Sequence, residues 1–179
     1  KAMVVTSSRA AAIRYKKGFD KYIEKHPEHS GIYSLVAFSG KLTGKQVMHS
    51  DDERIAGEVF VVDENEEFTE INMNPGIAGQ DLRIAFERPE YRVMLVADKF
   101  QTGFDQPLLH TMYVDKRLAG IQAVQTLSRL NRIHPLKEDT FVLDFVNDRE
   151  EIRAAFKTYY EGAEIGDEVE PTRLYAIKG

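Results

Sequence analysis

Short runs of apolar residues alternate along the chain with stretches that have the spacing of helices. The apolar runs have the length of buried strands and cover residues 2–6, 33–38, 92–97, 111–114 and 140–145. The helical spacing covers residues 9–25, 80–87, 119–132 and 149–160. Continuously apolar strands that alternate with helices predict an α/β fold, with a parallel sheet flanked by helices on both faces. In such folds, ligands bind at the carboxyl ends of the strands.

Local signals refine the first helix and add one weaker strand. Ser7 or Ser8 can cap the helix over residues 9–25, and His26-Pro27 ends it. Residues 58–63 have the composition of a short strand, but they lie inside a strongly acidic stretch.

Charge is distributed unevenly and suggests how the chain is organised. Residues 51–70 hold nine acidic residues and one basic residue, and residues 148–170 hold eight acidic and three basic residues. Residues 91–137, between them, hold seven basic and three acidic residues. Local charge decides where a phosphate docks, so the net charge of −5 does not exclude a nucleic-acid partner. We expect one domain over residues 1–147 with an acidic elaboration at about 50–75, and then a helix and acidic tail over residues 148–179.

Composition excludes several classes of protein. The apolar share of 42% is enough for a sizeable core, and no apolar stretch approaches the roughly 18 residues of a membrane span. The absence of cysteine rules out disulfides and thiolate metal sites and fits a reducing cytoplasm. We therefore expect a cytoplasmic protein with no membrane contact and no metal site of its own. Because the chain begins at Lys1 rather than Met, we interpret it as a piece of a longer protein.

Two segments resemble parts of an ATPase site without meeting its requirements. Residues 40–46, Gly-Lys-Leu-Thr-Gly-Lys-Gln, resemble a P-loop, but they have three residues between the glycines instead of four. Gln46 also stands where a P-loop needs a Ser or Thr for magnesium. Asp63-Glu64 follows an apolar run, like the acidic pair that holds magnesium in NTPases, but it has no P-loop to serve. We read both segments as polar surface turns.

The helix predicted over residues 119–132 carries a polar pattern that suits a phosphate. Gln125, Arg129 and Arg132 are four and three residues apart, which places them on a narrow arc of an α-helix. Guanidinium groups keep their charge and bind phosphate oxygens with two parallel hydrogen bonds. From spacing alone, an exposed helix with surface arginines is the favoured interpretation.

The segment that follows the strand over residues 92–97 is a second candidate. Gly103 permits a tight turn close to a ligand, Thr102 offers a hydroxyl to a phosphate, and Asp105 could accept from a sugar hydroxyl. Taken alone, the segment is better interpreted as an ordinary turn between a strand and a helix.

Together and in this order, these segments resemble the motifs of superfamily 2 helicases. Gln125-Thr-Leu-Ser-Arg129-Leu-Asn-Arg132 resembles motif VI, Thr102-Gly103-Phe-Asp105 resembles motif V, and residues 3–9 resemble motif IV. The longer run from Arg92 through residues 101–107 and 110–116 to Arg132 is similar to the restriction subunit of type I restriction–modification enzymes. Ser128 departs from the glycine usual in the superfamily and matches the restriction-subunit form. The resemblance covers most of residues 1–145.

The resemblance implies the second, C-terminal RecA-like lobe of a two-lobed motor, a P-loop NTPase-like fold without its own P-loop. Arg129 and Arg132 would be catalytic, reaching ATP that the missing first lobe holds with magnesium, and we expect no cofactor bound to this chain alone. Gly103, Asp105 and Gln125 would also face the nucleotide. Contacts with the DNA backbone would come from Thr6, Ser7, Ser8, Arg9, Gly40 and Thr102.

The implied partners are double-stranded DNA, the first RecA-like lobe of the same parent chain, and the methylation and specificity subunits. The parent would be an ATP-dependent type I site-specific deoxyribonuclease, whereas this fragment alone would be inactive. Two other functions stay open: a non-catalytic interaction domain that retained the fold, and a self-contained nucleotide-binding domain. The acidic residues around Glu150 and Glu164 are interpreted as a solvated tail and not as a nuclease centre.

Overall fold

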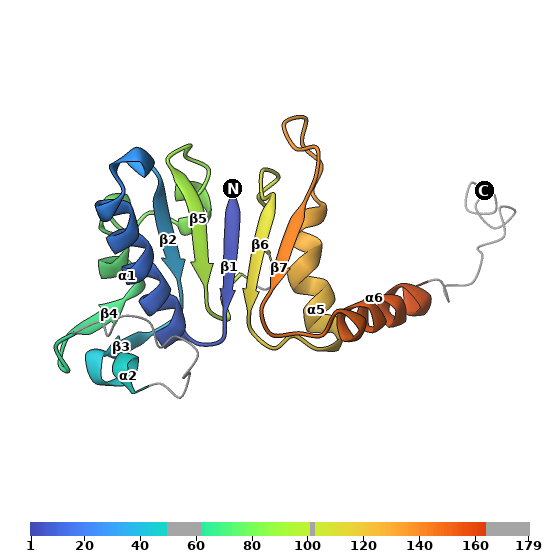
Figure 1. Cartoon of the computed structure of the whole chain (residues 1–179), viewed down its shortest axis with the longest axis horizontal. Helices are drawn as coiled ribbons and strands as arrows, with labels where there is room; N and C mark the ends of the chain where they lie inside the picture. Colours follow the sequence, from blue (N-terminus) through green and yellow to red (C-terminus); the bar gives the residue numbers. More distant parts are fainter. Residues whose placement is uncertain (50–61, 101–102, 164–179) are drawn as a thin grey trace, which may run out of the picture.

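The computed structural model describes residues 1–49, 62–100 and 103–163. Its centre is a five-stranded sheet in the order β2-β5-β1-β6-β7, in which all neighbouring strands are parallel (Figure 1). The strands are β1 Ala2–Thr6, β2 Tyr33–Ala37, β5 Tyr91–Val96, β6 Thr111–Asp115 and β7 Phe141–Asp144. The predicted apolar runs are thus confirmed as five parallel strands.

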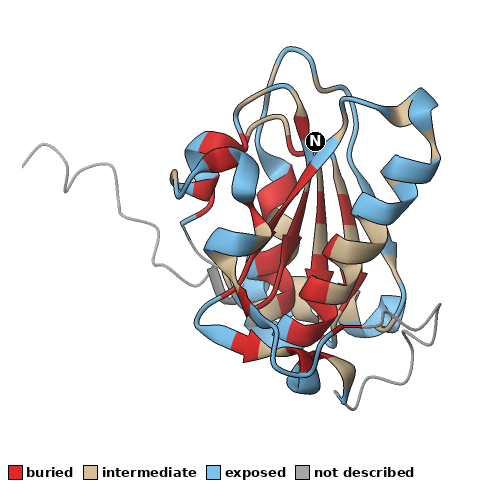
Figure 2. Ribbon diagram, turned by 90° about the vertical axis from the view of Figure 1, so that its left-hand side faces the viewer, coloured by how far each residue is buried: buried red, intermediate tan, exposed pale blue. Residues whose placement is uncertain are grey.

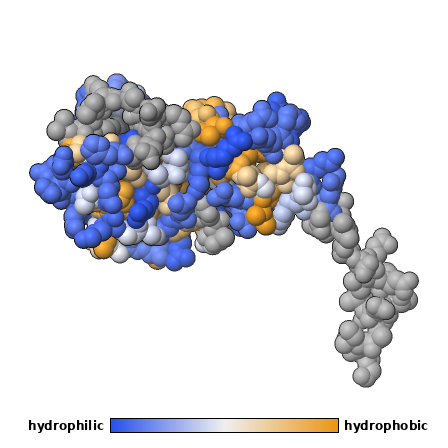
Figure 3. Space-filling view, turned by 90° about the horizontal axis from the view of Figure 1, so that it is seen from below, coloured by the Kyte–Doolittle hydropathy of each residue, from blue (hydrophilic) through white to orange (hydrophobic). Residues whose placement is uncertain are grey.

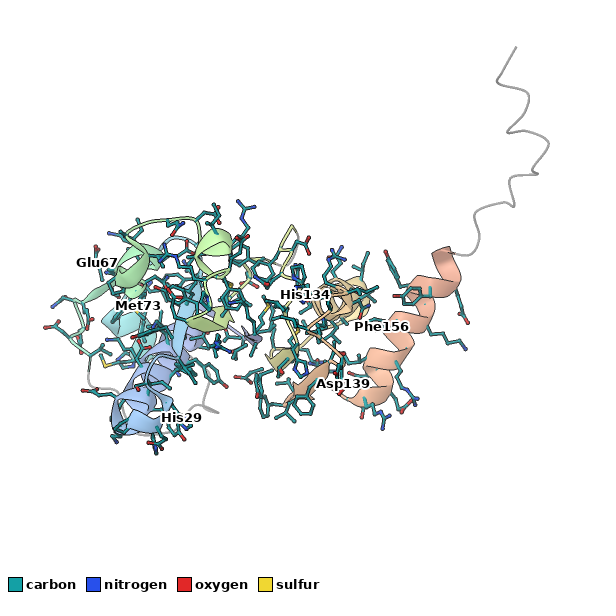
Figure 4. All side chains as sticks on the ribbon, turned by 90° about the horizontal axis from the view of Figure 1, so that it is seen from above. His29, Glu67, Met73, His134, Asp139 and Phe156 are labelled. Atoms are coloured by element: carbon teal, nitrogen blue, oxygen red, sulfur yellow. The ribbon has the colours of Figure 1, made fainter. Side chains whose placement is uncertain are left out.

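Helices cover both faces of the sheet, which confirms the predicted α/β class with a RecA-like arrangement. The helix α1 (Arg9–Lys25) packs on one face, and α4 (Leu82–Ala85) and α5 (Gly120–Leu127) pack on the other. In the view from above, His29, just after α1, and His134, near α5, lie on opposite sides of the sheet (Figure 4). Buried residues concentrate in the strands and in the inward faces of these helices (Figure 2).

The bounds of α1 follow from local signals, as predicted. The Ser8 side chain accepts a hydrogen bond from the Ala11 N–H at 3.1 Å, so Ser8 is the N-cap. Such a cap satisfies one of the N–H groups that the first turn leaves without a helical partner. The inward residues of the first turns, from Ala10 to Ile13, are buried against the sheet. The helix ends at Lys25, before His26 and Pro27.

Two predicted helices differ from the structure. The helix expected over residues 80–87 is the single turn α4, which Asp81 caps through the Arg83 N–H at 2.8 Å. The segment expected to be a helix over residues 119–132 is an α-helix only as far as Leu127. It continues as a 3-10 turn over Ser128–Asn131, and the backbone is extended at Arg132. The last helix, α6 (Arg149–Ala163), packs against α5 and then leaves the body of the domain (Figure 1).

A small hairpin unit follows β2 and was not predicted. Strands β3 (Lys41–Thr43) and β4 (Glu67–Thr69) pair antiparallel, and the short helices α2 (Gly44–Met48) and α3 (Glu70–Met73) follow them. Apolar residues of this unit join the core on the α1 side; they are Leu42, Val47, Val62 and Phe68. The described part of the acidic segment, residues 62–75, therefore contributes to the core. The strand expected over residues 58–63 lies almost wholly outside the described residues.

The segment that resembles a P-loop is part of this unit. Its first lysine begins β3, and Thr43 caps α2 in a reciprocal capping box with Gln46. A Cβ on Gly44 would lie 1.9 Å from the Asp63 carbonyl oxygen, so glycine is needed there for close packing of two backbones. The predicted polar surface turn is therefore wrong for this segment, which forms β3 and the start of α2 and buries Leu42 and Gly44.

The outer edge of β2 is closed by a side chain instead of a strand. Asn74 is buried, and its amide accepts from the Val36 N–H at 2.9 Å and donates to the Val36 carbonyl at 2.8 Å. These two bonds reproduce the pairing that another strand would make. The opposite edge strand, β7, keeps Phe141, Val142 and Leu143 40–49% exposed.

No helix among the described residues is long and apolar enough to cross a membrane.

Candidate functional site

The residues that resemble motifs V and VI meet in the folded chain. The Arg132 Nε donates to the Asp105 Oδ1 at 2.9 Å, although the two residues are 27 positions apart. Both side chains stay largely in solvent, with 54% of Arg132 and 70% of Asp105 exposed. An exposed pair of this kind contributes little to stability and exchanges easily for another partner. Arg132 is therefore available to an anionic ligand.

Arg129 is placed very differently from Arg132. Its residue is only 8% exposed, and its Nη1 donates to the Phe104 carbonyl at 3.3 Å. Burial lowers the pKa of the Arg129 guanidinium, and the nearby Arg132 charge lowers it further. The group is charged at neutral pH nonetheless, because an arginine titrates far above that range. Arg129 therefore fixes the backbone just before Asp105.

The expectation that Gln125, Arg129 and Arg132 share one exposed arc is wrong. Gln125 is exposed on α5, but Arg129 faces inward from the 3-10 turn and Arg132 lies beyond it. A 3-10 turn has three residues per turn instead of 3.6, so residues four apart no longer share the face that an α-helix gives them. Arg132 has already left the turn, because its backbone is extended. Ala123, Val124 and Leu130, on the inward side of this segment, are buried.

Lys137 supports the Arg132 backbone and was not identified from the sequence. Its Nζ donates to the carbonyl oxygens of Leu130 and Arg132, each at 2.6 Å, and lies 3.4 Å from that of Pro107. Burial lowers the pKa of this amine. No motif marks Lys137, because its partners are main-chain carbonyls that only the fold brings together.

This group does not lie at the carboxyl edge of the sheet. Leu108, next to Pro107, accepts from the main-chain nitrogen of Lys1 at 3.0 Å, immediately before β1 begins. Phe104 packs in the core on the α4 and α5 face, with its ring centroid 6.1 Å from that of Phe86. The arginine group thus occupies the α5 face toward the amino ends of β1 and β6. It is separate from the carboxyl edge of the sheet, where ligands bind in most folds of this class.

The loop after β5 leads into this group through an unusual backbone. Asp98 and Phe100 have φ angles of 57° and 62°, and Gly103 has a φ angle of 68°. Non-glycine residues adopt this left-handed region rarely, and they do so near functional segments more often than elsewhere. Thr102 lies outside the described residues, so its predicted contact with DNA has no structural account.

The second group of predicted residues does lie at the carboxyl ends of strands, after β1 and β2. Arg9 is exposed, and its Nη1 donates to the Ser39 carbonyl at 2.9 Å. Gly40 has a φ angle of 77°, and a Cβ there would be 3.1 Å from Arg9 Nη1. The structure therefore brings Arg9 and Gly40 together, although they are distant in sequence.

Not every residue of this second group faces solvent. Thr6 has no exposed surface, and its hydroxyl lies 2.9 Å from the Val96 carbonyl and 3.0 Å from that of Ser8. The predicted contact between Thr6 and DNA is therefore wrong for this conformation, because the hydroxyl is enclosed where β1 meets β5. Ser8 uses its side chain as the N-cap of α1, and Ser7 is partly exposed.

Most of the basic stretch between residues 91 and 137 is occupied by protein partners. Lys99 pairs with Glu70, Lys116 with Asp98 and Arg117 with Glu151. Figure 3 views the side toward which the strands point, where hydrophilic surface dominates and apolar side chains gather between the body and α6. Within this stretch, positive charge stays available to a phosphate at Arg117 and Arg132, because both members of each of their ion pairs are exposed.

The exposed residues of the arginine group suit one side of a nucleotide site, but not a complete site. An exposed guanidinium beside an exposed carboxylate can reach phosphate and ribose groups, and Gly103 leaves open space where a Cβ would project. Within the described residues, no group of three or more His, Asp or Glu side chains could hold a metal ion. The donor set suits contact with an anion.

Comparison with known proteins shows the family to which the chain belongs. A family model for domain 3 of type I restriction enzyme subunit R matches residues 1–147. The chain is 33% identical over 152 residues to a Methanocaldococcus jannaschii protein, which is named as the putative endonuclease subunit of type I restriction enzyme MjaVIIP. The matched region covers 82% of this chain and 13% of that protein. The chain is also 30% identical over 165 residues to the HindI endonuclease subunit of Haemophilus influenzae, covering 89% of this chain and 14% of that subunit.

The chain thus spans about one seventh of the length of these relatives. The family model ends at Asn147, just before α6 begins. On the match over residues 1–147, the chain belongs to the family of domain 3 of type I restriction enzyme R subunits.

Proposed function

We propose that this chain is the second RecA-like motor lobe of an ATP-dependent DNA translocase within a type I restriction endonuclease subunit. The observation that carries the proposal is the contact between Arg132 and Asp105, which joins the segments resembling motifs VI and V at one exposed place. ATP, held with magnesium by the first lobe of the same parent chain, would supply the phosphoryl group whose hydrolysis drives movement. The parent would cleave DNA with a separate nuclease domain.

Within this proposal, the two arginines have different roles. Arg132 turns from Asp105 to the phosphates and stabilises the charge that develops during phosphoryl transfer. Asp105, once released, accepts from a ribose hydroxyl, and Gly103 lets the main chain approach the nucleotide. We expected Arg129 to reach the phosphates as well, but its burial favours a structural role, in which it holds Phe104, and therefore Asp105, in place.

The second group would bind the DNA backbone. Arg9 carries the positive charge of this group, and its guanidinium, held by the Ser39 carbonyl, can bind a phosphate next to Gly40. Ser7, Ser8 and Thr102 would add hydroxyl contacts. The methylation and specificity subunits, with which such a subunit would assemble, would select the DNA sequence.

The proposal is tested by the substitution Arg132→Ala in the full-length subunit, assembled with its partner subunits. DNA-stimulated ATP hydrolysis should fall by about a thousandfold or more, the range found for arginine fingers, while the subunit still folds and binds DNA. Arg83→Ala is the matched control, because Arg83 is also an exposed arginine paired with an aspartate, at 2.7 Å from Asp81. Normal ATP turnover in Arg132→Ala would exclude the proposed role.

A non-catalytic interaction domain is the alternative, and one observation separates it from a motor lobe. A motor requires a P-loop in the parent chain on the amino-terminal side of Lys1, and its absence would favour the interaction domain. The self-contained nucleotide-binding domain predicts measurable ATP affinity for the chain alone. The motor lobe predicts none, because the arginine group lacks a loop that cradles phosphates.

A further inference from the structure

The carboxylate of Glu70 joins two strands that are neighbours in the sheet. Glu70 is the first residue of α3, and its Oε2 accepts from the Phe38 N–H at 3.1 Å, just after β2. Both of its oxygens also accept from the Lys99 Nζ, at 2.6 and 2.7 Å, just after β5. The side chain is only 25% exposed. One acidic residue of the unpredicted hairpin unit thus links the carboxyl ends of β2 and β5.

Glu70 is held firmly enough to serve as a fixed point. Asn74, at the other end of α3, pairs with both main-chain groups of Val36 and donates to the Glu70 carbonyl at 2.7 Å. Thr69 caps the helix from the other side in a capping box with Asn72. The helix is therefore bonded to β2 at both ends, and Glu70 cannot shift without breaking buried hydrogen bonds.

Lys99, in contrast, lies in a loop whose backbone conformation is unfavourable without contacts from other residues. It lies between Asp98 and Phe100, both of which have left-handed φ angles. Each such residue costs on the order of 1 kcal/mol and persists only when surrounding contacts impose it. Asp98 is bound by Lys116, Lys99 by Glu70, and the Phe100 ring packs 5.1 Å from that of Phe104. Contacts from Lys116 after β6, from Glu70 in the hairpin unit and from Phe104 in the same loop therefore impose this backbone.

We propose that Glu70 is a positioning residue. It holds the loop after β5, which leads to the motif V residues Gly103 and Asp105, in a fixed place relative to the carboxyl ends of β1 and β2, where Arg9 and Gly40 lie. Its two partners point to this role: Phe38 directly precedes Ser39, which holds Arg9, and Lys99 directly precedes the segment that leads to Gly103 and Asp105. Glu70 thereby fixes the position of the expected DNA contacts relative to the loop that approaches the nucleotide. This inference rests on the proposed motor function and adds the acidic hairpin unit to it.

The experiment uses the full-length, assembled subunit with Glu70→Gln, Lys99→Met and the double variant. Glu70→Gln keeps an oxygen for the Phe38 N–H but loses the charge that holds Lys99, and Lys99→Met leaves Glu70 on Phe38. Each single change should raise the DNA concentration that gives half-maximal stimulation of ATP hydrolysis by about fivefold or more, a typical coupling between sites. The double variant should match the single variants, because both remove one interaction. The KM for ATP should stay unchanged.

Two controls separate positioning from stability. Lys99→Arg keeps the charge and should retain the normal DNA dependence. Lys41→Met removes the exposed ion pair with Glu67 in the same hairpin unit, 2.6 Å long, and should leave ATP hydrolysis and its DNA dependence unchanged. Thermal unfolding of every variant is recorded alongside.

The possible outcomes are distinguishable. If Glu70→Gln and Lys99→Met lower the unfolding temperature but leave the DNA dependence normal, Glu70 is structural and the inference is overturned. Additive effects in the double variant would also overturn it, because the two residues would then act separately. The variant Arg132→Ala tests the motor proposal itself. If Arg132→Ala loses ATP turnover while Glu70→Gln has a normal DNA dependence, only the inference about Glu70 is overturned. Normal ATP turnover in Arg132→Ala would overturn the motor role.

Discussion

The two groups of motif residues lie in different parts of the sheet, yet the fold divides each group in the same way. On the α5 face, Arg129 is buried against a main-chain carbonyl while Arg132 is exposed. At the carboxyl edge, Thr6 is enclosed between strands while Arg9 is exposed. In each group, one residue is part of the local structure and a near neighbour in sequence stays exposed. A motif therefore combines scaffold and contact residues, and its pattern does not distinguish them.

The largest effect should separate the two arginines. Arg129→Ala removes a buried, charged donor from the Phe104 carbonyl and leaves a void, so the free energy of unfolding should fall by about 2 kcal/mol. Arg132→Ala, at an exposed position, should change it by less than about 0.5 kcal/mol. Urea denaturation of both variants measures the difference. Equal losses would mean that burial does not distinguish the two side chains.

A smaller effect is expected for the enclosed residue of the other group. Thr6→Val keeps the shape of the side chain but leaves the Val96 and Ser8 carbonyls without the hydroxyl, which should cost about 1 kcal/mol of stability. DNA affinity of the assembled subunit should not change, because Thr6 is not exposed. If the variant lost DNA affinity while keeping normal stability, Thr6 would contact the DNA backbone as the sequence predicted.

The smallest change in stability, and a clear change in binding, is expected for Arg9. Arg9→Ala should alter the free energy of unfolding by less than about 0.5 kcal/mol, as for most surface substitutions. If Arg9 binds one phosphate, the slope of log affinity for DNA against log salt concentration should fall by about one. Lys21→Ala, on the exposed later part of α1, is the comparison, and an equal change there would point to general charge and not to a site.

The central elements were predictable because their signals are local. The bounds of α1 agree with the prediction at both ends, since the Ser8 cap and the His26-Pro27 stop are sequence neighbours of the helix. The five strands agree to within a residue at nearly every end, because each is a short, continuously apolar run. The α/β class follows from their alternation with helices.

The hairpin unit shows why the remainder was not predictable. Strands β3 and β4 have three residues each and pair across more than twenty residues of intervening chain, so neither has a periodic pattern of its own. Glu70 lies in a run of acid that suggests a solvated surface, and nothing in that run distinguishes it from Glu67, which is exposed. Only the fold places Glu70 between the Phe38 N–H and the Lys99 amine.

The sequence by itself determined the class of fold, the order of the strands along the chain and the resemblance to the restriction-subunit motifs, because hydrophobic periodicity, caps and motif spacing depend on residues that are close together in the chain. The tertiary structure decided which motif residues are accessible. The 3-10 turn at Ser128–Asn131 directs Arg129 inward and leaves Arg132 outside, and the packing of β1 against β5 encloses Thr6. Accessibility depends on contacts between segments that are distant in the chain, and for that reason the motifs could name these residues but not assign their roles.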